Sequence, residues 1–318
     1  MHVRRTVKVR ATLSLTVTIM VASLTAWPAL ASRATAQIPA PTRCAVGIPE
    51  SEKSGYVPLP RGDVFCPLLA DPKGQRSFVS YLRETGDGGD MDIGSVGISD
   101  MFGLVRIGGS NAGDGFQISV AGSVFAQFDL NTSSYDLINA DYIVGFPITI
   151  RSGAFSTRLR IYHQSSHIGD ELLLRENNPD FERENISFES AELILSLDRG
   201  PVRVFGGGEY LLRRDPKDLE RSLLHGGIEL RPAQRLLRFG SVAGVRFVAA
   251  GDVKASEQQD WKPAISVRTG FEFDRPRDSD PPGRRWGLLF EAYDGPSPYG
   301  QFFRRDVRYY GAGIHFTL

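Results

Sequence analysis

The sequence predicts an all-β protein, a transmembrane antiparallel β-barrel of about twelve strands that follows an N-terminal signal peptide. Three observations favour this class. Hydrophobicity alternates with period two along most of the chain, turn residues separate the alternating segments, and the first 36 residues resemble an export signal. The balance of 37 Lys and Arg residues against 37 Asp and Glu residues excludes the strongly basic surface of a general nucleic-acid binder.

Residues 1–36 are expected to be a secretory signal peptide. Basic residues within 4–10 precede an apolar stretch over 11–30, and small residues at 34–36 form the favoured cleavage site, with 29–31 as the alternative site. An uncleaved membrane anchor is the competing interpretation. No later segment has the ~18 consecutive apolar residues of a transmembrane helix. The mature chain is therefore expected to be an exported soluble protein or a barrel.

The segment 37–76 is expected to precede the barrel as a periplasmic or plug-like extension. It holds both cysteines of the chain, Cys44 and Cys66. Exported proteins enter an oxidising compartment, so a disulfide that closes this segment fits the sequence, and two unpaired thiols are the alternative. A chain with two cysteines is neither a disulfide-rich scaffold nor a cysteine-rich zinc protein.

The barrel itself is predicted over 77–318. In one typical segment, Phe116 and Ile118 alternate with Gln117 and Ser119, which places the two kinds of side chain on opposite faces of a strand. The predicted strands lie near 77–84, 96–109, 115–129, 141–152, 154–166, 186–198, 201–213, 222–231, 239–251, 262–274, 285–294 and 307–318.

The connections between these strands are unequal. Residues 152–154 and 198–201 form tight turns, whereas 167–185, 252–261 and 295–306 are long and polar. Short turns on one side, long loops on the other and an even strand number are typical of outer-membrane barrels.

The last strand ends in the alternating series Tyr310, Ala312, Ile314, Phe316 and Leu318. This series resembles the C-terminal signal by which bacterial barrels are recognised for assembly, although that signal usually ends in Phe or Trp. The resemblance implies the barrel-assembly machinery as a partner and the outer membrane of a Gram-negative bacterium as the location.

A soluble β-sandwich or a lipocalin-like barrel would show the same alternation with the polar face outward. The export signal, the unequal connections and the terminal series favour the membrane barrel, in which charges line the lumen. Mixed charges predict a lumen filled by salt bridges rather than a wide channel. The charges predicted to line it are Arg106, Arg158, Arg160, Arg203, Glu209, Glu229, Arg246, Arg268, Glu272 and Glu291.

His163 and Ser165 are the candidate catalytic residues. Both share the parity of Leu159 and Ile161, so they are expected on the lipid face, and the strand runs outward from the turn at 152–154. They should therefore lie near the outer leaflet. A serine hydroxyl needs a base to become a nucleophile, and His163 can be that base. A hydrogen-bonded polar rim without catalysis is the alternative.

Glu189 is the candidate third member of this site. In the next predicted strand, 186–198, it has the parity of the apolar residues and is expected to face outward. If Ser166 lies opposite Ile186, antiparallel pairing brings Glu189 opposite His163. A carboxylate at that position would orient the imidazole of the base.

The series His-Gln-Ser at 163–165 resembles the outer-membrane phospholipase A and lipid A deacylase barrels. This resemblance implies hydrolysis of ester bonds in phospholipid or lipid A. The phospholipase has Asn-Gly after its serine, whereas Ser-His stands at 166–167 here. The longer run at 160–171, which contains Tyr-His-Gln-Ser-Ser-His, and the upstream run at 67–72 resemble a bacterial family of exported proteins of unknown function. That second resemblance implies no activity.

His167, Asp170 and Glu171 are a candidate cation site for Ca²⁺ or for a divalent ion on lipopolysaccharide, because carboxylate oxygens are ligands that such ions prefer. A solvated loop that caps its own backbone is the alternative, since a calcium site needs several oxygens and only two carboxylates are present. No other cofactor is expected.

Two function classes therefore remain open. One is a serine-dependent hydrolase of lipid esters in the outer leaflet, with membrane lipids and lipopolysaccharide as its partners. The other is a non-enzymatic barrel, either a narrow pore or a structural protein of the outer membrane. No nucleic-acid partner is expected.

Overall fold

The computed structural model describes residues 48, 54–85, 90–109, 113–175, 184–232, 234–239, 243–274 and 285–317. These residues all belong to the compact unit Ala40–Leu318. The predicted signal peptide, residues 1–36, lies outside the described residues. No helix in the described part of the chain is both long and apolar enough to cross a membrane.

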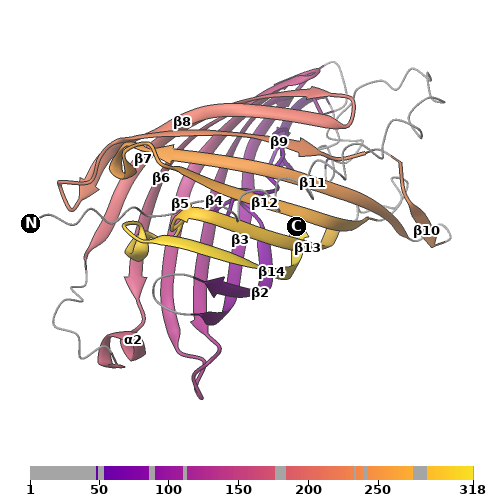
Figure 1. Ribbon diagram of the computed structural model, residues 1–318. Coiled ribbons are helices and arrows are strands. Elements are labelled where there is room, and N and C mark those ends of the chain that lie inside the picture. Colours follow the sequence, from indigo (N-terminus) through magenta and orange to yellow (C-terminus); the bar gives the residue numbers. More distant parts are fainter. Residues whose placement is uncertain are drawn as a thin grey trace, which may run out of the picture. The chain divides into compact units, whose positions relative to one another are not determined.

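The described chain forms one antiparallel sheet of fourteen strands, in which two strands, β1 and β10, pair only at the margin and the other twelve form a closed barrel (Figure 1). Each barrel strand pairs with its neighbours in chain order, and β14 pairs with β2 to close the ring. The predicted class and strand number are confirmed. The barrel strands are β2 (Ser77–Thr85), β3 (Met91–Gly108), β4 (Gly115–Asp129), β5 (Leu137–Ser152), β6 (Phe155–Ile168), β7 (Ile186–Arg199), β8 (Val202–Asp215), β9 (Ser222–Leu230), β11 (Ala243–Ser256), β12 (Pro263–Asp274), β13 (Arg285–Pro296) and β14 (Asp306–Thr317).

Small elements complete the fold. Strand β1 (Gly55–Pro58) pairs with the last residues of β3, and β10 (Leu237–Phe239) pairs with the first residues of β11. Helix α2 (Asp170–Arg175) follows β6. Two 3-10 turns, η2 (Glu257–Gln259) and η3 (Gly300–Phe302), lie in the connections after β11 and β13.

The two faces of the barrel have opposite polarity. Along β6, Leu159 and Ile161 are exposed, whereas Arg158 and Arg160 are buried inside. The same alternation on the last strand exposes Tyr310 and buries His315 completely. A soluble sandwich or lipocalin-like barrel would bury its apolar face instead, so this inverted arrangement excludes that alternative for the described chain.

The two ends of the barrel are distinguished by their connections. We call the end where β2 begins and β14 ends the turn end, and the opposite end, where α2 lies, the helix end. Tight turns join β5 to β6 and β7 to β8 at the turn end. Their glycines, Gly153 and Gly200, have φ values of +57° and +58°, a left-handed conformation that glycine adopts at no steric cost.

The difference in loop length between the ends is smaller than the sequence predicted. Strand β11 continues to Ser256 and β12 begins at Pro263, so half of the expected long loop 252–261 is strand. At the turn end, the connections 231–242 and 275–284 both have more residues than 257–262, the connection that joins β11 to β12 at the helix end. Period-two alternation simply continues along β11, because Val253 still points outward and Asp252 inward.

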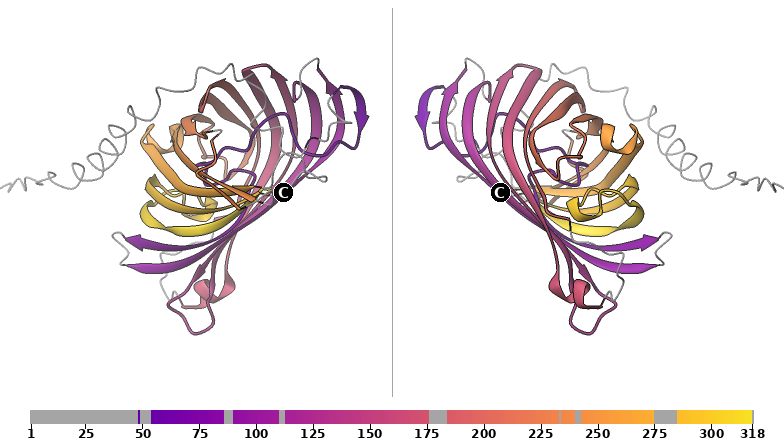
Figure 2. Two further views of the ribbon diagram at one scale, coloured as in Figure 1. Left: turned by 90° about the vertical axis from the view of Figure 1, so that its right-hand side faces the viewer. Right: turned by 90° about the vertical axis from the view of Figure 1, so that its left-hand side faces the viewer.

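The chain before β2 passes through the barrel interior. Figure 2 looks along the barrel and shows this violet chain inside the ring of strands. We call residues Pro60–Arg76 the inner segment. Its apolar side chains Phe65, Leu68 and Leu69 are almost completely buried, and Cys66 is disulfide-bonded. The other cysteine of the chain, Cys44, lies outside the described residues.

Inward-facing arginines of the barrel hold the backbone of the inner segment. Arg203 Nη1 donates to the carbonyl of Cys66 at 3.1 Å, and Arg268 Nη1 donates to the carbonyl of Leu69 at 3.1 Å. In return, the amide of Leu69 donates to Glu229 Oε1 at 2.5 Å. These bonds give buried backbone groups the partners that they would otherwise lack.

Ion pairs add to this attachment. Lys254 Nζ lies 2.7 Å from Asp71 Oδ1, and Lys73 pairs with Asp141 of β5. Burial by itself raises the pKa of Asp71, but the neighbouring positive charges, that of Lys254 first, and the hydrogen bonds to this carboxylate together outweigh burial and hold that pKa well below its usual range. Asp71 is therefore a carboxylate at neutral pH, anchored to the barrel wall.

A second layer closes part of the helix end. The connection 297–305 turns inward, where the hydroxyls of Tyr299 and Ser95 are hydrogen-bonded at 2.8 Å. Gln301 Nε2 donates to the carbonyl of Ser166 at 2.7 Å. The inner segment therefore occupies the lumen, and the connection 297–305 narrows the lumen again nearer the helix end.

We expect no steady current when the purified protein is inserted into planar bilayers. Asp71→Ala should produce frequent openings, because it removes the carboxylate that binds Lys254 and loosens the inner segment. Asp306→Ala is the matched control, since it breaks an exposed Lys–Asp pair with Lys262 at the helix end that does not hold the inner segment, and it should behave like the wild type. A porin-like current at every wild-type insertion would contradict a filled lumen.

Candidate functional site

The candidate site lies on the outer face of β6. The side chains of His163 and Ser165 are partly exposed on this face, and Gln164 between them is buried inside the barrel. Both residues lie in the half of β6 nearer the helix end. The face and the strand direction agree with the sequence prediction, because a strand alternates strictly unless a bulge interrupts it.

Strand pairing brings Glu189 beside this histidine. The β6–β7 register places His163 opposite Glu189 and Ser165 opposite Ser187, which is the register that we expected. His163 Nδ1 lies 3.3 Å from Glu189 Oε1. The side chains of His163 and Glu189 are 40% and 39% exposed, so the pair is open to whatever surrounds the barrel.

This arrangement leaves Nε2 of His163 for Ser165. An orienting carboxylate on Nδ1 and a serine on Nε2 are the two contacts that a serine–histidine catalytic site requires. Among the hydrogen bonds of the described residues, none joins His163 to Ser165. Catalytic hydrogen bonds in substrate-free enzymes are often long and shorten when substrate binds, so the missing contact is compatible with catalysis.

Arg213 is a member of the site that the sequence did not reveal. Its Nε lies 3.7 Å from Glu189 Oε2, and its side chain is 82% exposed. A register shift between β7 and β8 at Glu189/Ser190 leaves Leu212 as the extra residue. Leu212 and Arg213 are therefore both exposed in succession, and Arg213 stands opposite Glu189.

Exposed rings flank the site. Tyr142 of β5 lies opposite Ser165 and is 47% exposed, and Tyr210 of β8 is 49% exposed. Tyrosine is enriched where a membrane meets water. The rings therefore fit a position of the site close to the edge of an apolar belt.

The three residues of the predicted cation site are not gathered into a ligand set. His167 faces outward with its ring edge-on to Tyr142 at 5.7 Å, whereas Asp170 and Glu171 form the first turn of α2. Nowhere in the described chain do three His, Cys, Asp or Glu side chains stand together in a geometry that could hold a metal ion.

The barrel is similar to solved outer-membrane phospholipases. The outer membrane phospholipase A from Escherichia coli matches with a TM-score of 0.51 and 12% identity, over 76% of this chain and 90% of that one. The Salmonella typhi outer membrane phospholipase, a dimer with bound calcium, matches with a TM-score of 0.50 and 10% identity, over 78% of this chain and 94% of that one. At this identity the likeness shows the fold alone, that of an outer-membrane β-barrel.

Sequence comparison leads to a family rather than to an activity. No curated protein matches the chain. A family model described as "Protein of unknown function (DUF1207)" matches residues 15–318, which agrees with the resemblance of the His-Gln-Ser-Ser-His run to a family of unknown function. Because the match covers nearly the whole sequence, the chain belongs to the DUF1207 family.

Proposed function

We propose that this protein is an outer-membrane barrel that hydrolyses ester bonds of lipids in the outer leaflet, with Ser165 as nucleophile and His163 as base. One observation carries the proposal: both residues share the outward face of β6, with Glu189 on the second ring nitrogen of the histidine. A site on the outer wall is reached from the membrane, so its substrate would be a lipid rather than a molecule passing through the lumen.

The reaction would proceed in two steps. Ser165 Oγ would attack the ester carbonyl carbon while His163 Nε2 accepts the hydroxyl proton. The imidazolium would then give that proton to the departing alcohol oxygen, which leaves an acyl group on Ser165. Water, deprotonated by the same imidazole, would release the fatty acid and restore the serine. The carboxylate of Glu189 would hold the ring and stabilise its positive charge.

The location in the outer membrane of a Gram-negative bacterium belongs to the same proposal. Support comes from the exposed apolar face, from the similarity of the fold to outer-membrane phospholipases, and from the alternating series of β14, in which Ile314 and Phe316 point outward. The turn end would then face the periplasm, because outer-membrane barrels have short periplasmic turns. Membrane lipids, lipopolysaccharide and the assembly machinery are the proposed partners.

A non-enzymatic structural barrel is the second candidate. Contacts of His163 with Glu189, and of Glu189 with Arg213, tie three neighbouring strands together at the outer face. Polar contacts of this kind stabilise the pairing of neighbouring strands and need no catalytic role. A narrow pore is less compatible with the inner segment that occupies the lumen.

We expect the full-length protein to fractionate with the outer membrane and to migrate faster on gels when unboiled than when boiled, because a closed barrel resists detergent until it is heated. Sheet-rich circular dichroism in detergent should accompany this shift. Recovery of the mature protein in the soluble fraction without detergent would contradict the membrane location.

The catalytic proposal predicts a specific mutant series. Ser165→Ala and His163→Ala should each lower kcat for ester hydrolysis by about 10⁴-fold or more, and the double variant should lose no more than either, since nucleophile and base act as a unit. Glu189→Ala should cost less. Release of fatty acid from phospholipid and lipid A vesicles, with and without Ca²⁺, provides the measurement.

Ser187→Ala is the matched control for this series. Ser187 is also a serine on the outer face and lies opposite Ser165, so its loss should leave both activity and heat-modifiability unchanged. A fluorophosphonate lipid analogue should label the wild type and Ser187→Ala but not Ser165→Ala. If the wild type is neither labelled nor active on either lipid, the structural candidate stands instead.

A further inference from the structure

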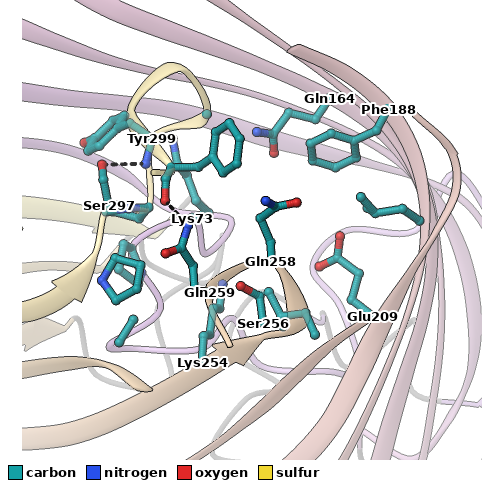
Figure 3. Close-up of a pocket in the computed structure, with 18 of the residues that line it drawn as sticks. Lys73, Gln164, Phe188, Glu209, Lys254, Ser256, Gln258, Gln259, Ser297 and Tyr299 are labelled. Carbon is teal, nitrogen blue, oxygen red and sulfur yellow. Dashed lines mark hydrogen bonds between the residues drawn. The ribbon is translucent and has the colours of Figure 1, made fainter. Parts of the chain in front are cut away.

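The barrel lumen holds a pocket at its helix end, above the inner segment. Its volume is about 220 Å³, its floor includes Pro72 and Lys73, and its rim includes the connection with Tyr299 (Figure 3). Strands β5 to β9 and β11 to β13 supply the walls. This pocket is separate from the outer face that carries His163 and Ser165.

The ions deepest in the pocket have partners within the protein. Lys73 pairs with Asp141, Arg160 with Glu192 at 2.8 Å and Lys254 with Asp71 at 2.7 Å, while Asp252 is hydrogen-bonded to His225 at 2.7 Å and Glu209 accepts from the hydroxyl of Tyr162. A buried charge that has a partner gains little from a second counter-ion and would have to be separated from the first. These partnered ions therefore offer little to a ligand that carries net charge.

Neutral polar groups remain available instead. Gln164 is only 8% exposed, and within the described chain its amide makes no hydrogen bond, although Figure 3 shows it directed into the pocket. Gln258 accepts a bond from the amide of Glu220 at 2.7 Å through its oxygen, which leaves its NH₂ group free to donate. A buried amide without a partner is costly unless water or a ligand satisfies it.

An aromatic ring lies beside the free amide. Phe188 of β7 is next to Gln164 in Figure 3 and lies edge-on to Tyr162 with ring centroids 6.2 Å apart. Tyr299 stands on the opposite side, and one face of its ring is covered by the ammonium of Lys73 at 3.9 Å. Phe188 is therefore the more accessible apolar plane in the pocket.

We propose that this pocket binds a neutral sugar ring. The hydroxyl groups of a sugar both donate and accept, which matches the amides of Gln164 and Gln258, and its C–H face can pack on Phe188. The small volume, below the roughly 300 Å³ at which pockets for drug-sized ligands begin, suits one ring. The ring could be a free hexose or the terminal sugar of a surface glycan, since both present the same chemistry.

Titration calorimetry on the detergent-solubilised full-length protein tests this proposal. Glucose and galactose are the free probes, and a deacylated lipopolysaccharide oligosaccharide is the glycan probe. Glucose 6-phosphate and glucosamine test whether charge is rejected. We expect at least one neutral probe to bind with a millimolar Kd and the charged sugars to bind at least tenfold more weakly.

Two variants on neighbouring strands test the assigned residues. Gln164→Leu and Phe188→Leu should each weaken sugar binding at least tenfold, because one loses the hydrogen bonds and the other the flat surface. Thr157→Val, on the outer face of β6 near the turn end, is the matched control and should bind like the wild type. Heat-modifiable migration of each variant verifies folding.

The outcomes separate this inference from the proposed hydrolase. Ser165→Ala should retain full sugar binding, since its side chain lies outside the barrel. Binding only by the oligosaccharide would support the proposal and assign the ligand to a glycan. Failure of every neutral probe, unchanged binding in Gln164→Leu, or preference for glucose 6-phosphate would each overturn it.

Discussion

The barrel depends on neutralising the charges inside it. A lumen lined by arginine and glutamate is stable only if each ion finds a counter-ion and each remaining donor finds an acceptor. Arg268 illustrates the solution, since it pairs with Glu291 at 2.7 Å and also donates to carbonyls of the inner segment. The paired charges and the bound backbone of the inner segment fill the barrel interior together. The apolar side chains therefore occupy the outward positions.

This division lets one strand serve two surfaces. On β6, His163 and Ser165 point outward, and Gln164 between them points into the lumen. The proposed lipid chemistry and the proposed sugar pocket are therefore adjacent in sequence but separated by the sheet. Closure of the lumen at the inner segment leaves the pocket as a blind end rather than as part of a passage.

The candidate site shows where prediction from sequence stops. Its faces were predictable, because alternation is strict outside bulges. The β6–β7 register was an assumption that agrees with the structure, since parity alone equally allows Ser187 or Ala191 opposite His163. Arg213 was not predictable, because a bulge at Leu212 changes the parity of β8 locally. The proposed cation site also depended on closeness in sequence alone, whereas the structure places His167 on a strand and Asp170 on the following helix.

The sequence by itself determined the strand number and which residues share a face, since these follow from a period of two that acts over neighbouring residues. The export signal and the terminal series, rather than the period, indicated a membrane barrel with its apolar face outward. Only the tertiary structure decided the path of the inner segment and the pocket above it. Contacts such as Leu69 with Glu229, which are 160 residues apart, carry no local pattern. They form because buried backbone and charged groups need hydrogen-bond partners, and closure of the barrel determines which partners lie within reach.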